Sequence, residues 1–358
     1  MKNTLDFKYI FLLLLTVLTV NTSSGQAMVT PEFNDAEKIE ALMKTRNIPA
    51  LGIGIIRDGQ LQEIKVYGEQ KKGQPASYAT LFNVASITKT VTAMVTLRLV
   101  NMGKWELDEP LYRYWIDPEV QDDPRSRKLT TRHILTHQTG FPNWRWQTKS
   151  KKLAFEFDPG TRFQYSGEGF EYLRHSLEKK FHRSLEHLAD SLIFKPLHMQ
   201  NTSYVWNDQM VSHFAFPHNT NREEQDFNKN SLPNAADMLR TTVADYGKFM
   251  VSIIKEDGLS KKLFGQMITP FVKIKENKFM GLGWAIYTNL GNGEYALSHS
   301  GVDPGVNTIA FILPKSKRGL LIFTNSDNGP LIYTELVKAY LKEQGQAISD
   351  IEMKKQDE

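Results

Sequence analysis

The chain has 358 residues, 41% of them hydrophobic and 23% charged, which is enough to bury a sizeable core in one large domain or two ordinary ones. Its formal net charge of +4 is too small to indicate nucleic acid or an anionic membrane surface as a partner. The sequence contains no cysteine, which excludes disulfides, thiolate metal sites and a cysteine nucleophile.

Residues 1–25 have the pattern of a secretory signal peptide. Lys2 and Lys8 precede an apolar run over residues 9–20, and small and polar residues follow it. The run is about a dozen residues long, which is too short to span a bilayer comfortably. We therefore expect cleavage near Gly25 or Ala27, a periplasmic or secreted protein, and no stable membrane span afterwards. The alternative is an uncleaved membrane anchor.

The next part of the chain predicts a helix, a hairpin and a second, longer helix. Apolar residues recur at helical spacing over 35–45. Two strands are expected over 51–56 and 61–67, joined by a tight turn at Asp58-Gly59. A strongly apolar helix follows over 86–102, and a glycine after it fits a C-terminal cap.

The remaining elements divide into a helical middle and a strand-rich end. The clearest helices of the middle are expected over 130–136 and 172–187. Strands and a closing helix are expected after it, at 283–287, 295–299, 308–313, 319–324 and 331–343. The charged end of the chain predicts disorder from about residue 350.

This order predicts an α/β plus all-α fold: an antiparallel sheet flanked by helices, built from both chain ends, with a helical insert between them. We assign 26–105 and 235–345 to an α/β subdomain, 106–234 to a mainly helical subdomain, and 346–358 to a polar tail. The active site is expected at the junction of the two subdomains.

A Ser-x-x-Lys pair, Ser86-Ile87-Thr88-Lys89, stands at the start of the apolar helix. Residues three apart on a helix share a face, so the two side chains are expected to meet. A serine hydroxyl is a weak nucleophile until a base takes its proton, and a lysine can be that base if burial lowers its pKa. Backbone N–H groups at the helix start would stabilise an oxyanion. The alternative is a helix-capping serine beside a surface lysine.

The spacing alone is weak evidence, because two other Ser-x-x-Lys pairs occur in the chain. Ser176 precedes Lys179, and Ser252 precedes Lys255. Both pairs lie in amphipathic helical patterns, so we expect all four of these residues on the surface.

Two further segments carry groups suited to the same chemistry. Tyr165 follows a Pro-Gly turn. His299-Ser300-Gly301 is expected to end a short strand and enter a Gly/Pro loop, where Gly301 would let the backbone approach a ligand closely. The alternatives are a core tyrosine and a hydrogen-bonded histidine at a strand end.

Taken in order, these segments resemble the motifs Ser-x-x-Lys, Tyr-x-Asn and Lys/His-x-Gly of the penicillin-binding-protein-like serine hydrolases. That family includes class C β-lactamases, DD-peptidases, and related esterases and D-aminopeptidases. The similarity covers roughly residues 35–340, and supporting segments lie at 107–110, 134–140, 196–199, 281–284 and 323–325. It implies a β-lactamase/transpeptidase-like fold.

The resemblance also implies roles for individual residues. Ser86 would attack the carbonyl carbon of the substrate. Lys89 and Tyr165 would shuttle its proton, with Tyr165 protonating the leaving group. The backbone N–H groups of Ser86 and Val302 would form the oxyanion hole. His299 and Ser300 would bind a substrate carboxylate or orient Tyr165.

Two departures from the family motifs concern the substrate. His299 stands where many members have lysine. A histidine at this position resembles DD-peptidases and several esterases of the group. Gly167 stands where asparagine is usual, and that asparagine normally holds the acyl amide of a β-lactam or peptide. We expect residue 167 to point into the cleft and its change to weaken β-lactamase activity. With Gly167, the expected substrate-binding residues are Ser300, Gly301 and Val302. Glu168 is the residue that could take over the amide contact.

Neither a metal nor a cofactor is predicted. His133 and His137 have the i, i+4 spacing of zinc ligands, but the glutamate of the His-Glu-x-x-His motif is missing and no third ligand is evident. Trp144-Arg145-Trp146 could line a substrate cleft or form a packed surface loop.

The predicted function is that of an exported serine hydrolase which forms an acyl-enzyme with a peptide or ester acyl donor, such as a D-amino-acid peptide of the cell wall. One alternative is a class C-like β-lactamase. Alternatives from other classes are a non-hydrolysing penicillin-binding receptor, acylated once, and a purely structural surface protein. The expected partner is a small-molecule or peptide substrate, and the sequence specifies neither its identity nor the oligomeric state.

Overall fold

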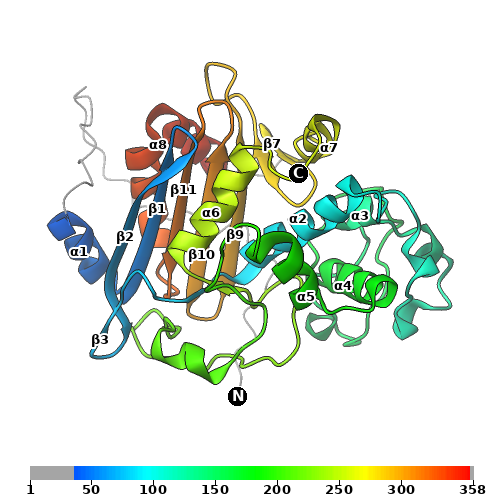
Figure 1. Ribbon diagram of the computed structural model, residues 1–358, viewed down its shortest axis with the longest axis horizontal. Coiled ribbons are helices and arrows are strands. Elements are labelled where there is room, and N and C mark those ends of the chain that lie inside the picture. The colour runs from blue at the N-terminus through cyan, green and yellow to red at the C-terminus, as the bar shows by residue number, and fades with distance from the viewer. Residues whose placement is uncertain (1–35, 355–358) are drawn as a thin grey trace.

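A computed structural model describes residues 36–354 and has a large antiparallel sheet at its centre (Figure 1). The sheet has nine strands in the order β3-β2-β1-β11-β10-β9-β8-β7-β6. Their bounds are β1 Ala50–Arg57, β2 Gln60–Lys71, β3 Gln74–Pro75, β6 Val272–Lys275, β7 Lys278–Met280, β8 Ala285–Tyr287, β9 Ala296–Asp303, β10 Val306–Leu313 and β11 Arg318–Thr324. Two short strands, β4 (Phe82–Asn83) and β5 (Arg240–Thr241), pair separately beside it.

The two chain ends meet in the middle of this sheet, as the sequence predicted. Strand β1 pairs with β11, with Leu51 opposite Thr324 and Ile55 opposite Leu320. The expected fold class is therefore confirmed. The subdomain boundaries at residues 105 and 235 stay a prediction.

Helices cover both faces of the sheet. Helix α1 (Ala36–Thr45) and helix α8 (Pro330–Met353) pack on one face, against the alternating apolar residues Leu51, Ile53 and Ile55 of β1. Helix α6 (Val243–Ile254) packs on the other face and contacts β1, β2 and β11. The short helix α7 (Lys261–Met267) precedes β6.

The helical middle lies to one side of the sheet (Figure 1), and α2 (Thr88–Asn101) connects the two. Residues 88–99 of α2 are all buried, which is expected for a helix enclosed on every side. The other helices here are α3 (Thr131–Leu135), α4 (Gly167–Phe181) and α5 (Leu185–Ala189). Shorter helical turns are η2 Ala85–Ile87, η3 Leu111–Arg113, η4 Pro118–Val120, η5 Pro124–Lys128, η6 Arg145–Gln147, η7 Asp190–Phe194 and η8 Asp208–Ser212.

The end of the chain differs from the expected polar tail. Helix α8 passes a non-helical backbone position at Lys342 and continues to Met353. Ile348 and Ile351, three residues apart, are buried, and Glu352 forms ion pairs with lysines of β6 and β7. The prediction of a polar tail was therefore wrong for residues 346–353. The charged residues of this segment lie on a helix whose opposite face is apolar, and the composition alone does not show that face.

The predicted signal peptide, residues 1–25, lies outside the described residues. Within residues 36–354, none of the helices is both long enough and apolar enough to cross a membrane.

Candidate active site

Ser86 lies on a tight turn, η2, immediately before α2, rather than on α2 itself. Ala85 precedes it with φ of 45°, a left-handed conformation that is unfavourable for a residue with a side chain. Two hydrogen bonds hold this conformation: the Ala85 N–H donates to Asn83 Oδ1 at 3.0 Å, and Thr88 Oγ1 donates to the Ala85 carbonyl. Strain of this kind, held by surrounding bonds, is frequent at functional sites.

Gly301 allows this turn to lie directly against strand β9. A Cβ atom at residue 301 would lie 2.2 Å from the Val84 carbonyl oxygen and 3.0 Å from the Ala85 Cβ. The sequence predicted a close approach of a ligand here, and the structure places the chain's own backbone at that position. The predicted strand end was also wrong, because residues 299–301 lie inside β9 and pair with β10.

Lys89 is fully buried, one helical turn after Ser86. Its Nζ lies 3.0 Å from Ser86 Oγ and 2.8 Å from the Ala236 carbonyl oxygen. Burial lowers the pKa of Lys89 to about 7, although the neighbouring carboxyl groups, that of Asp237 first, act in the opposite sense. A large fraction of Lys89 is therefore a neutral amine at neutral pH, able to accept the proton of Ser86.

Tyr165 meets the same pair from the loop before α4. Its hydroxyl is hydrogen-bonded to Ser86, and its ring centroid lies 4.7 Å from Lys89 Nζ. Burial raises the pKa of Tyr165 well above its usual range, so that its hydroxyl is protonated at neutral pH and can donate. Ser86, Lys89 and Tyr165, predicted from separate motifs, are thus brought together.

His137 is a site residue whose place the sequence did not reveal. Its ring lies 4.3 Å from the Tyr165 ring, centroid to centroid, and its Nδ1 accepts the Ser166 N–H at 3.1 Å. Burial holds the pKa of His137 well below its usual range, so the ring is neutral. The ring therefore packs against Tyr165 and fixes its loop. In the sequence, His137 stood out only as part of the family-like segment 134–140. That segment does not indicate that His137 contacts Tyr165.

His299 lies on β9, with its ring centroid 6.2 Å from that of Tyr165. Its Nδ1 donates to the Ser300 carbonyl at 2.7 Å. Burial lowers the pKa of His299 to about 3, and the charge of Lys89 adds to this effect. A neutral imidazole offers no positive charge to a carboxylate. The role of His299 in orienting Tyr165 stays a prediction. Farther along β9, Val302 is 39% exposed.

Gly167 does not present an open position to the cleft. It begins α4, and a Cβ atom there would lie 2.6 Å from Cζ2 of Trp144. The indole therefore fills the space that a side chain at residue 167 would need, which contradicts the expectation that residue 167 points freely into the cleft. Gly167 lies three and four residues before Phe170 and Glu171, both of which interact with Lys89. Trp144 thus covers the face of α4 that is turned toward Lys89.

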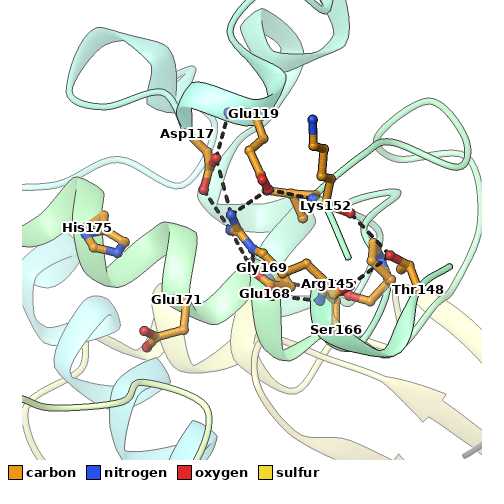
Figure 2. A network of polar contacts seen from close by, with 12 residues as sticks. Asp117, Glu119, Arg145, Thr148, Lys152, Ser166, Glu168, Gly169, Glu171 and His175 are labelled. Carbon is orange, nitrogen blue, oxygen red and sulfur yellow. Dashed lines mark hydrogen bonds and ion pairs between the residues drawn. The ribbon is translucent and has the colours of Figure 1, made fainter. Parts of the chain in front are cut away.

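Glu168 is not available for a substrate amide either. Its side chain is buried and accepts hydrogen bonds from the backbone and guanidinium of Arg145, at 2.8 to 3.0 Å (Figure 2). Asp117 and Glu119 accept from the same guanidinium at 2.7 and 2.9 Å. Although burial opposes the charge, the carboxylates of Glu168 and Asp117 raise the pKa of Arg145. This network fixes the loop that carries Trp144.

Comparison with known proteins places this geometry in a family. A family model described as Beta-lactamase matches residues 36–339. The chain belongs to the β-lactamase family. Because this family consists of serine hydrolases, the membership supports a serine hydrolase in general.

Among curated family relatives, the chain is 23% identical to protein flp of Staphylococcus aureus (strain MRSA252) over 311 residues, which cover 80% of this chain and 61% of flp. It is 28% identical to esterase EstB of Burkholderia gladioli over 221 residues, 53% of this chain and 55% of EstB. The chain thus spans little more than half the length of these relatives.

Two solved structures share the fold. D-alanine carboxypeptidase AmpC from Burkholderia cenocepacia has a TM-score of 0.72 and 21% identity, over 87% of this chain and 97% of that protein. The octameric penicillin-binding protein homologue from Pyrococcus abyssi has a TM-score of 0.69 and 24% identity, over 88% and 77% of the two chains.

The other two Ser-x-x-Lys pairs differ from the family motif in their surroundings. Ser176 and Ser252 are buried, contrary to the prediction, and donate to the carbonyls of Tyr172 and Phe249 within their own helices. Their lysine partners are exposed, as expected. Neither lysine has the burial that Lys89 has beside Ser86, so neither pair forms an enclosed serine–lysine contact.

The two histidines that were considered as zinc ligands have separate roles. His133 Nδ1 accepts the Thr130 N–H at the start of α3, and His137 packs on Tyr165. Within residues 36–354, no group of three or more metal-ligating side chains is gathered in one place.

Proposed function

We propose that this chain is a serine hydrolase that acts through an acyl-enzyme on Ser86, with an ester or peptide as the acyl donor. The observation that carries the proposal is the fully buried Lys89 amine, 3.0 Å from Ser86 Oγ, whose pKa burial lowers to about 7. A nucleophile paired with a base of near-neutral pKa, and with a second proton carrier at hydrogen-bonding distance, is the arrangement that acyl transfer requires.

The proposed first step forms the acyl-enzyme. Ser86 Oγ attacks the carbonyl carbon as its proton passes to Lys89 Nζ, and the carbonyl electrons move to oxygen. The N–H groups of Ser86 and Val302 would stabilise that oxyanion. When the tetrahedral intermediate collapses, the leaving group takes the Tyr165 proton, and Lys89 returns a proton to Tyr165. Water then attacks the acyl carbon and gives a proton to Lys89 Nζ, the bond to Oγ breaks to release the acid, and Lys89 passes that proton to Ser86 Oγ.

The site supports esters over anionic peptides as the preferred substrates. The imidazole of His299 is neutral, so it offers no positive charge to a terminal carboxylate. Trp144 covers residue 167, where a polar side chain could otherwise contact an acyl amide. The relative EstB is named an esterase, which also supports an ester substrate. The structural neighbour AmpC is named a D-alanine carboxypeptidase, so a D-alanyl peptide is the second candidate.

Export to the periplasm or medium is proposed from residues 1–25 alone. Deleting them should stop export while leaving hydrolytic activity intact, measured by cell fractionation and an ester assay. Truncated protein found outside the cytoplasm would contradict this.

Turnover of p-nitrophenyl butyrate, a D-alanyl-D-alanine peptide and a penicillin, with intact mass followed over time, tests the proposal. A serine hydrolase of the proposed type turns over at least one substrate, through a transient adduct that is absent in Ser86→Ala. A stable adduct without turnover would instead indicate a receptor. No adduct on Ser86 with any acyl donor would indicate a structural protein.

A further inference from the structure

Asn83 has no part in the mechanism above, yet its side chain is buried beside the candidate nucleophile. It lies on β4, three residues before Ser86. Its oxygen, Oδ1, accepts the N–H of Ala85 at 3.0 Å, and its nitrogen, Nδ2, donates to Asp303 Oδ2 at 3.1 Å. This one side chain therefore joins the turn that carries Ser86 to the end of strand β9, which is far away in the sequence.

The two partners determine how the carboxamide of Asn83 is oriented. A backbone N–H can only donate, so the carboxamide oxygen must face Ala85. The carboxyl oxygen of Asp303 accepts, so the carboxamide nitrogen must face β9. A leucine at residue 83 would have a similar shape but could make neither bond.

The residues that Asn83 joins are the direct neighbours of the two proposed oxyanion donors. Ala85 precedes Ser86, and Asp303 follows Val302. An oxyanion hole stabilises the transition state only if both donors lie about 2.7–3.1 Å from the oxygen. The two donors belong to segments distant in the sequence, so their spacing depends on contacts that hold the turn against β9.

Other contacts support the turn on its carbonyl side. Thr308 Oγ1, on β10, donates to the Val84 carbonyl at 2.9 Å, and the Val84 N–H donates to the Leu239 carbonyl at 3.0 Å. These bonds remain when Asn83 is replaced. We therefore expect its loss to shift the turn relative to β9 without unfolding the protein.

We propose that Asn83 is a positioning residue whose carboxamide holds the N–H groups of Ser86 and Val302 at the spacing that the oxyanion requires. It acts through Ala85 and Asp303 rather than on the substrate itself. This inference rests on the proposed function and adds to it the contact that sets the geometry of the oxyanion hole.

Two replacements of Asp303 separate the hydrogen bond from the carboxyl group. Asp303→Asn and Asp303→Leu both remove the carboxyl group, but only asparagine still offers an oxygen to Asn83 Nδ2. Misplacing a catalytic group by about 1 Å can cost about 100-fold in rate. We expect kcat/KM to be about 10- to 100-fold lower in Asp303→Leu than in Asp303→Asn.

The experiment measures kcat/KM for p-nitrophenyl butyrate at pH 8.5, above the pKa of about 7 of Lys89, so that the titration of the base does not enter. The affinity for butylboronic acid, which forms a tetrahedral anionic adduct with an active serine, is measured in parallel. It should fall by a similar factor. In an Asn83→Leu background the two Asp303 variants should have equal kcat/KM, because residue 303 has lost its partner.

Asn325→Leu is the matched control. Asn325 is also a buried carboxamide that joins two segments: it accepts the Ala50 N–H and donates to the Phe216 carbonyl, both at 2.8 Å. Its replacement should lower the stability measured by urea unfolding. It should leave kcat/KM and the boronic acid affinity of the folded protein unchanged, because neither bond involves the Ser86 turn.

Two results would overturn the inference. One is equal kcat/KM in folded Asp303→Asn and Asp303→Leu. The other is a difference between them that persists in the Asn83→Leu background. If Asn83→Leu does not fold, the two Asp303 variants and their boronic acid affinities still decide, and Asp303→Ala replaces Asp303→Leu if the leucine is not tolerated. Turnover that persists in Ser86→Ala would instead overturn the proposed function.

Discussion

Replacing Gly167 with alanine tests whether Trp144 fills the space beside the candidate site. The added Cβ would lie 2.6, 2.7 and 2.8 Å from three carbons of the Trp144 ring, closer than carbon atoms pack. Overpacking of this kind costs about 1–3 kcal/mol. Alanine is favoured over glycine in the middle of a helix by about 0.5–1 kcal/mol. Gly167 is the first residue of α4, so a smaller gain offsets that cost.

The sign of the effect should therefore depend on Trp144. In the wild-type background, Gly167→Ala should destabilise the fold, because the steric cost exceeds the helix gain. In a Trp144→Ala background the clash is gone, so the same change should no longer destabilise the fold and should stabilise it by at most about 0.5–1 kcal/mol. The difference between the two backgrounds is a coupling free energy of about 1–3 kcal/mol.

Urea unfolding of the wild type, both single variants and the double variant measures this coupling. Trp146→Ala provides the matched control, since Trp146 lies in the same loop and is 60% exposed. In that background Gly167→Ala should cost as much as in the wild type. Equal costs in the Trp144→Ala background would refute the packing argument. An asparagine at residue 167 should accordingly affect amide substrates only when Trp144 is made smaller.

Two further perturbations test the base and the network behind the loop. Lys89→Met should lower kcat/KM by about 100- to 10,000-fold. It should also remove the acidic limb of the pH–rate profile near pH 7, because that limb reports the loss of the Lys89 proton as pH rises. A profile with an unchanged limb would assign the base to another group. Arg145→Met leaves the buried Glu168 and Asp117 without their cation and should cost about 3–5 kcal/mol in urea unfolding. Arg113→Met, at an exposed ion pair, is the control and should leave the urea unfolding curve nearly unchanged. Equal costs for the two arginines would contradict the burial argument.

The parts of the fold that depend on local pattern could be predicted from the sequence. The apolar run over 51–56 indicated a buried strand, and the spacing of Ser86 and Lys89 predicted that their side chains meet. The closing helix was placed correctly up to its middle, but its last turns are largely polar, and the burial of Ile348 depends on a sheet that the local sequence does not show.

The features of the site that were missed join segments far apart in the chain. Trp144 lies over Gly167, and His137 packs on Tyr165. Each contact depends on the orientation that the fold gives to a loop. Neither hydrophobic periodicity nor motif spacing specifies that orientation. The exchange of the usual asparagine for Gly167 indicated an altered cleft, but only the packing of Trp144 shows what replaced it.

Labelling with a fluorophosphonate probe, followed by intact mass, tests the central claim most directly, because such probes react with activated serine hydroxyls. The account predicts one adduct on the wild type, located at Ser86 by peptide mapping, with a labelling rate that rises with pH through about 7 as Lys89 loses its proton. It predicts no adduct on a folded Ser86→Ala variant. An adduct that persists in Ser86→Ala at the wild-type rate would show that the nucleophile is another residue.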